Sequence, residues 1–89
     1  MRLSSNWVVK IRDRAYKELL RFSNKDKERI VAAVNSLSID PYDGDLEKMR
    51  GEVGVWRRRV GNYRIFFEIF PDDRIVYVFS VERRTSTTY

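Results

Sequence analysis

A Gly61-Asn62 pair separates two runs of strand-forming residues, and this arrangement limits the fold of the chain more than any other feature. The run before the pair reads V-G-V-W-R-R-R-V, and the run after it reads Y-R-I-F-F-E-I-F. β-Branched and aromatic residues favour strands, and a Gly/Asn pair between two such runs is typical of a β-hairpin. The sequence therefore predicts two antiparallel strands joined by a tight turn at this pair.

The predicted hairpin is unusually rich in arginine around its turn. Residues 56–64, W-R-R-R-V-G-N-Y-R, include no acidic residue and carry the arginines Arg57, Arg58, Arg59 and Arg64. Side chains alternate between the two faces of a strand, so Arg57 and Arg59 share one face and Arg58 lies on the other with Trp56 and Val60.

The second strand of the hairpin indicates which face is the core. The apolar face is formed by Tyr63, Ile65, Phe67 and Ile69, which leaves Arg64, Phe66 and Glu68 on the opposite face with Arg57 and Arg59. Three guanidinium groups on one face repel each other unless an anion lies among them, and a phosphate backbone is the simplest candidate. The alternative is a basic strand face exposed to solvent. The alternation places the charged Arg58 with the core residues, so either its head group reaches water at the sheet edge or the register differs.

Two helices are predicted before the hairpin. Residues 6–11 read as a short strand, and Asp13 is a suitable N-cap for a first helix over residues 14–22. Ser23 or Asn24 caps a second helix, which ends before Pro41. The apolar stripe of this helix consists of Ile30, Ala33, Val34 and Leu37.

The last part of the chain completes an antiparallel sheet. Residues 41–52 are predicted to be a loop, and residues 75–81 a final strand with Ile75, Tyr77, Phe79 and Val81 on its core face. The order β-α-α-β-β-β predicts an α+β fold in which the two helices pack on an antiparallel sheet. With 89 residues, this is a single domain over residues 1–89.

Composition narrows the possible chemistry. The chain has no histidine and no cysteine, so disulfides, thiol catalysis, histidine bases and the usual zinc sites are excluded, and no cofactor is predicted. A net charge of +5 favours a polyanionic partner. No stretch approaches the ~20 apolar residues of a membrane helix, and the first residues do not resemble a signal peptide. The protein is therefore expected in the cytoplasm.

Three segments resemble the RelE family of toxins from prokaryotic toxin–antitoxin pairs. They are L-E-K-M-R-G, V-W-R-R-R-V-G-N-Y-R-I-F-F-E-I and V-F-S-V-E-R-R, and the resemblance, with a terminal tyrosine, covers nearly the whole chain. It implies the microbial RNase-like RelE fold and a ribosome-dependent endoribonuclease that cuts mRNA and inhibits translation. It also implies a RelB-like antitoxin partner in a hetero-oligomer.

The resemblance also assigns roles to individual residues. Arg57 and Arg59 match basic positions that hold the RNA backbone, and Arg64 matches the arginine at the scissile phosphate. Arg84, or Arg83 if the register slips by one, matches the arginine at the end of the last strand. Tyr89 matches the C-terminal catalytic tyrosine. Some family members have lysine at the first two positions, and the spacing to Tyr89 differs from some relatives.

RNA cleavage without a metal uses the 2′-hydroxyl as nucleophile. Arginines suit the stabilisation of charge on the phosphorane, but a proton must also be removed. Tyr89 is the evident base candidate, Glu68 is an alternative, and Phe66 is predicted to stack on a base. Two other functions stay open: a ParE-like inhibitor of DNA gyrase, which generally lacks this arginine and tyrosine set, and a non-catalytic module that binds RNA or an acidic peptide.

Overall fold

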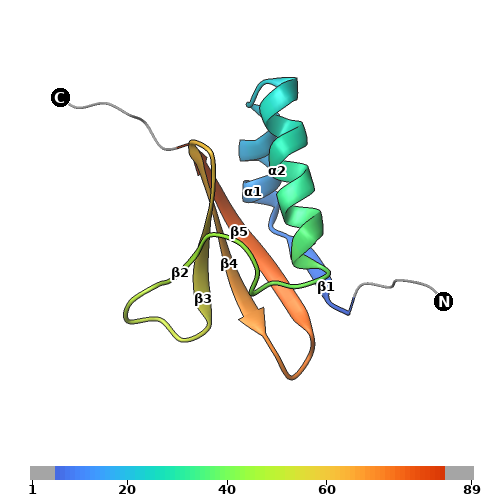
Figure 1. Cartoon of the computed structure of the whole chain (residues 1–89). Helices are drawn as coiled ribbons and strands as arrows, with labels where there is room; N and C mark the ends of the chain where they lie inside the picture. The colour runs from blue at the N-terminus through green and yellow to red at the C-terminus, as the bar shows by residue number, and fades with distance from the viewer. Residues whose placement is uncertain (1–5, 84–89) are drawn as a thin grey trace.

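A five-stranded sheet with two helices on one face forms the protein, as seen in the computed structural model, which describes residues 6–83 (Figure 1). In chain order the elements are β1 (Val8–Ile11), α1 (Asp13–Leu20), α2 (Asn24–Leu37), β2 (Leu46–Lys48), β3 (Val55–Val60), β4 (Tyr63–Phe70) and β5 (Ile75–Arg83). The predicted α+β class, with two helices packed on a sheet, is confirmed. Within the described part of the chain, no helix has the length and apolar character needed to span a bilayer.

The sheet differs from the predicted one in two respects. Its strand order is β1-β5-β4-β3-β2, and β1 pairs with β5 in parallel, so the sheet is mixed rather than antiparallel. In addition, Leu46–Lys48, within the predicted loop, forms the edge strand β2 beside β3. A polar edge strand of three residues has too short a pattern to be recognised from sequence, although short charged edge strands are common in natural sheets.

Both helices begin close to their predicted positions. The hydroxyl of Ser23 accepts a hydrogen bond from the backbone N–H of Asp26 at 3.2 Å, so the predicted cap of α2 is confirmed. The prediction for α1 is off by one residue: Arg12 is the N-cap and Asp13 is the first helical residue. The predicted α2 stripe of Ile30, Ala33, Val34 and Leu37 is buried on the sheet together with Ala15 and Leu19 of α1.

A β-bulge in β5 overturns the predicted core face of that strand. Phe66 pairs with Ser80 while Phe67 pairs with Val78, so Phe79 is the extra residue. Val76 and Val78, rather than the alternate residues predicted from Ile75 onward, are fully buried. The bulge then reverses the alternation, and Val81 returns to the core as predicted.

A hydrogen bond fastens the hairpin to the start of α2. The hydroxyl of Tyr63, which is buried, donates to Oδ2 of Asp26 at 2.6 Å. This bond lowers the pKa of Asp26, and the same bond, with burial, raises the pKa of Tyr63. Tyr63 therefore serves the core, as predicted, and lies on the helix-covered side of the sheet.

Candidate functional site

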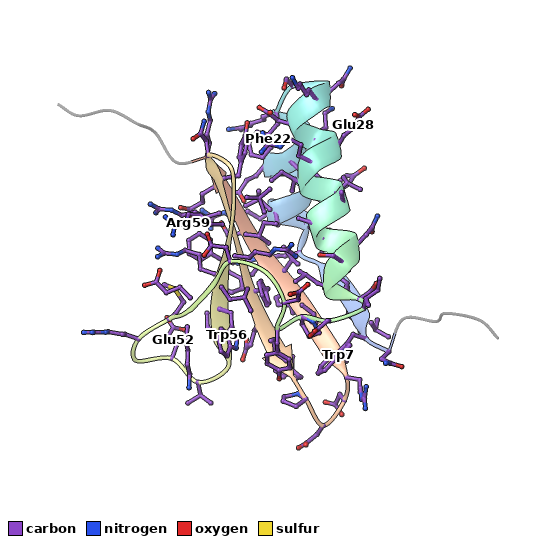
Figure 2. All side chains as sticks on the ribbon, in the orientation of Figure 1. Trp7, Phe22, Glu28, Glu52, Trp56 and Arg59 are labelled. Carbon is purple, nitrogen blue, oxygen red and sulfur yellow. The ribbon has the colours of Figure 1, made fainter. Side chains whose placement is uncertain are left out.

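The face of the sheet opposite the helices, here called the open face, carries the predicted site residues in rows that run across the strands. Figure 2 shows Arg59 pointing away from the helices. In the first row Arg59 of β3 lies directly opposite Arg64 of β4, and Arg64 lies opposite Glu82 of β5. Two like charges in adjacent cross-strand positions repel, and Glu82 is the carboxylate that this row itself contains.

The second row combines a charged pair with an aromatic residue. Glu47 of β2 lies opposite Arg57 of β3, Arg57 opposite Phe66 of β4, and Phe66 opposite Ser80 of β5. The structure thus brings Arg57, Arg59, Arg64 and Phe66 together on one face, in the positions predicted from strand alternation. Their proposed roles toward RNA stay predictions.

Two carboxylates from the β2 edge pair with the arginines of β3. Nε of Arg59 lies 3.3 Å from Oδ2 of Asp45, and the guanidinium of Arg57 forms a salt bridge with Glu47. Residues 56–64 contain no acidic residue, but the folded face does carry carboxylates, because Asp45, just before β2, and Glu47 of β2 lie beside β3. The alternation D-x-D-x-E over Asp43, Asp45 and Glu47 was the available signal for this strand face.

Arg64, at the centre of the open face, differs from Arg57 and Arg59 in its ion pairing. Arg64 is half-buried and forms no salt bridge with any carboxylate of the described residues, although Glu82 stands opposite it in the register. Arg64 is consequently the open-face arginine of residues 6–83 with the most available charge for an anion.

An aromatic pair lies beside the arginines. The rings of Phe66 and Phe79 are 6.2 Å apart at an angle of 36°, and both side chains are partly exposed. Aromatic rings on an exposed sheet can stack on unpaired bases. Phe79 was missed in the sequence because its parity, before the bulge is known, places it in the core.

Arg58 is a structural residue rather than part of this face. It lies on the helix-covered side, as its parity requires, and its guanidinium donates to the backbone oxygen of Ala33 at 3.3 Å and to the hydroxyl of Ser36. The backbone at Gly44 passes directly over this guanidinium. The register is therefore as predicted, but the prediction that the head group extends to the sheet edge is wrong, because Arg58 instead links β3 to the last turns of α2.

The C-terminal site residues divide into two groups. Arg83 pairs with Tyr63 on the helix-covered side and lies near enough to Asp26 to lower the pKa of that carboxyl, so it is not brought together with the open-face arginines. Arg84 and Tyr89 lie outside the described residues. Glu68 lies on the open face between Val55 and Tyr77. In residues 6–83 no group of three acidic, histidine or cysteine side chains is placed to hold a metal ion.

Comparisons with known proteins identify the family and the fold of the chain. Residues 8–87 match the family model described as the ParE toxin of type II toxin-antitoxin system, parDE. The chain is 25% identical over 79 residues to the curated protein "Putative toxin RelE1" of Methanocaldococcus jannaschii, covering 85% of this chain and 88% of that protein.

Solved structures share the fold at low sequence identity. RelE in the archaeal RelE-RelB complex from Pyrococcus horikoshii OT3 matches with a TM-score of 0.80 at 21% identity, covering 92% of this chain and 99% of that one. The isolated E. coli RelE toxin matches with a TM-score of 0.78 at 18% identity, covering 91% and 87%. With the family model spanning nearly all of the sequence, the chain belongs to the ParE toxin family of type II toxin–antitoxin systems and is a RelE-like toxin within the RelE/ParE superfamily.

Proposed function

We propose that this toxin is a ribosome-dependent endoribonuclease that cuts mRNA and thereby inhibits translation. The observation that carries the proposal is the open face, where Arg57, Arg59 and Arg64 stand on two adjacent strands beside Phe66. Planar guanidinium groups bind phosphates with two hydrogen bonds, and an aromatic ring beside them suits an unpaired base. A single strand of RNA offers both groups.

The proposed reaction uses no metal. A base takes the proton of the 2′-hydroxyl next to the scissile bond, and the 2′-oxygen attacks phosphorus. The 5′-oxygen of the next nucleotide leaves and takes up a proton, so a 2′,3′-cyclic phosphate and a 5′-hydroxyl form. Arg64 stabilises the charge that develops on the phosphate, since among the open-face arginines of residues 6–83 its guanidinium forms no salt bridge with a carboxylate. Arg57 and Arg59 hold the flanking backbone. Arg84 and Tyr89 keep the roles that the resemblance assigns to them, and Glu68 is the alternative base.

The dependence on the ribosome follows from the weak proton transfer that these residues offer. The ordinary pKa of tyrosine is about 10, and arginine does not give up its proton at neutral pH. Alignment of the message by the ribosome supplies the positioning that in-line attack needs. Cleavage of free RNA as fast as cleavage of a translated message would overturn this part of the proposal.

A RelB-like antitoxin in a hetero-oligomer is the proposed protein partner, together with mRNA and the ribosome. The Pyrococcus horikoshii RelE, which shares the fold, was solved in complex with RelB. An exposed basic face favours an acidic or amphipathic segment of a partner. Because mRNA and ribosomes are the targets, the proposed location is the cytoplasm.

Inhibition of DNA gyrase is the second candidate function, because the matched family model is that of ParE toxins. Arg64 at the centre of the open face has a role in RNA cleavage, whereas inhibition of gyrase requires no such arginine. Purified gyrase therefore separates the two candidates: inhibition of supercoiling at stoichiometric toxin supports the second, and unaffected supercoiling supports the first.

The decisive experiment is induced expression in bacteria followed by primer extension. The variants are wild type, Arg64→Ala and the matched control Arg50→Ala, which removes the same charge from an exposed loop residue. Cuts that occur only in a translated message, persist in the control and vanish in Arg64→Ala support the proposal. Growth arrest with intact mRNA, or equal cleavage by Arg64→Ala with an unchanged circular dichroism spectrum, overturns it.

A further inference from the structure

A basic groove lies at the edge of the sheet farthest from the β2–β3 ion pairs. It has a volume of ≈ 980 Å³ and is formed by the end of β1, by α1 and by Tyr77 of β5. Its cations are Lys10, Arg12, Arg14, Lys17 and Arg21, against two acidic residues, Asp13 and Glu18. The groove is distinct from the site described above, because β5 separates β1 from β4, the strand that carries Arg64 and Phe66.

One face of α1 supplies most of this charge. Arg14 and Lys17 of α1 and Arg21, its C-cap, follow each other at intervals of three and four residues. Their side chains therefore form a line along the helix, with neighbours about 5–6 Å apart. All three are exposed. Cations at this spacing are close enough together to contact successive phosphates of one nucleic-acid strand.

The acidic residue in the middle of the groove is already engaged. Oε1 of Glu18 accepts a hydrogen bond from the backbone N–H of Val81 at 2.9 Å, and a second, longer one from the hydroxyl of Ser80 at 3.4 Å. Glu18 thereby provides a hydrogen-bond acceptor for a backbone N–H of β5 that lies beyond the end of β1. Apart from a 3.8 Å contact between Arg14 and Glu18, the groove cations form no salt bridge with carboxylates of residues 6–83.

The groove is continuous with the open face. Ser80, which bonds to Glu18, ends the row that contains Arg57 and Phe66. Lys10 and Tyr77, at the rim of the groove, extend the neighbouring row that contains Glu68. With strands about 4.8 Å apart, the distance from β1 to β3 across the sheet is only ~14 Å. A single polyanion can therefore contact both regions.

From these observations we infer that the groove is a second binding site for the phosphate backbone of RNA, outside the cleavage site. The inference deepens the proposed function and rests on it. Five of the nine lining residues are cations and three of these are arginines, whose planar guanidinium binds phosphate oxygens with two hydrogen bonds. Among the lining residues, Ile11 and Tyr77 carry an aliphatic or aromatic side chain, whereas an amphipathic protein segment needs a row of apolar anchor sites.

The test is the affinity for a single-stranded oligouridylate RNA, measured by fluorescence anisotropy as a function of salt concentration. The groove variant is Lys17→Gln/Arg21→Gln, and the control is Lys25→Gln/Arg50→Gln, which removes the same charge at exposed positions outside the groove. Loss of two phosphate contacts reduces the salt slope by about 1.4 and the affinity at 0.1 M salt by roughly tenfold to thirtyfold. The control variant should stay within about twofold of wild type.

The possible outcomes separate this inference from the proposed function. If the groove variant binds the RNA as tightly as its control, the inference that the groove binds RNA is refuted, whatever the cleavage activity of the variant. Loss of binding to polyglutamate with unchanged RNA affinity assigns the groove to an acidic protein segment and also overturns it. Arg64→Ala tests the proposed function in the same assay: it should keep most of the RNA affinity that the groove provides while losing cleavage of translated mRNA.

Discussion

The salt bridges of Asp45 and Glu47 with Arg59 and Arg57 predict that β2 weakens RNA binding by the open face. A phosphate that binds either guanidinium bidentately competes with a carboxylate already in place. The perturbation is the double variant Asp45→Asn/Glu47→Gln, which keeps the size of both side chains and removes their charge. We expect this variant to bind RNA more tightly than wild type.

The magnitude follows from the exposure of the pairs. The Arg59 and Asp45 side chains are 53% and 63% exposed, and those of Arg57 and Glu47 are 26% and 64% exposed. At 3.3 Å the Coulomb energy in bulk water is about 1.3 kcal/mol. Measured values for exposed pairs are about 0.2–1 kcal/mol. Release of both pairs should therefore tighten RNA binding by roughly twofold to thirtyfold.

The assay is anisotropy with a single-stranded RNA at 0.1 M salt. The control is Glu28→Gln/Asp72→Asn, which adds the same two units of net charge at exposed positions away from the open face. Tighter binding by the β2 variant than by this control supports the argument. Equal affinities would show that only net charge matters. Weaker binding than wild type would refute the reasoning outright, since it would mean that the carboxylates orient the guanidiniums for RNA.

Three further predictions concern the folded state. Tyr63→Phe should lower stability at neutral pH, and because the Tyr63 hydroxyl holds the pKa of Asp26 below its ordinary value of 3.8, the variant should lose less stability than wild type below about pH 4 in urea titrations. Gly44→Ala should cost roughly 1–3 kcal/mol in urea unfolding, since its φ of +100° disfavours a side chain and a Cβ would lie 2.7 Å from Nε of Arg58. Phe67→Ala, at a fully buried position, should cost about 3–5 kcal/mol, and a loss under 1 kcal/mol would contradict the assigned core.

Much of the fold could be predicted because its signals are local. The turn at Gly61-Asn62, the cap at Ser23 and the apolar stripe of α2 each depend on residues within a few positions of one another. The faces of β3 and β4 followed from alternation alone, and this was enough to bring Arg57, Arg59 and Arg64 together. The α+β class and the open face follow from these local features.

The features that could not be predicted depend on pairing between distant segments. The bulge at Phe79 has no signal in the sequence of β5, because apolar residues occupy both sets of alternate positions before it. Only the register against β4 shows that Val76 and Val78 face the core. Likewise, β2 is recognisable as a strand only once β3 is beside it.

The charge of the open face is therefore a property of the folded sheet rather than of the arginine-rich segment. Arginines at the β2 edge are held by carboxylates, which fix their direction and reduce their net charge. Arg64, one strand farther in, has no such partner among the described residues, and repulsion from Arg59 opposite raises its demand for an anion. The sheet thus orients cations at its edge and concentrates uncompensated charge at its centre. A phosphate bound there would relieve the repulsion between Arg59 and Arg64, and this gives a physical reason for placing the scissile phosphate at Arg64 and the flanking backbone at Arg57 and Arg59.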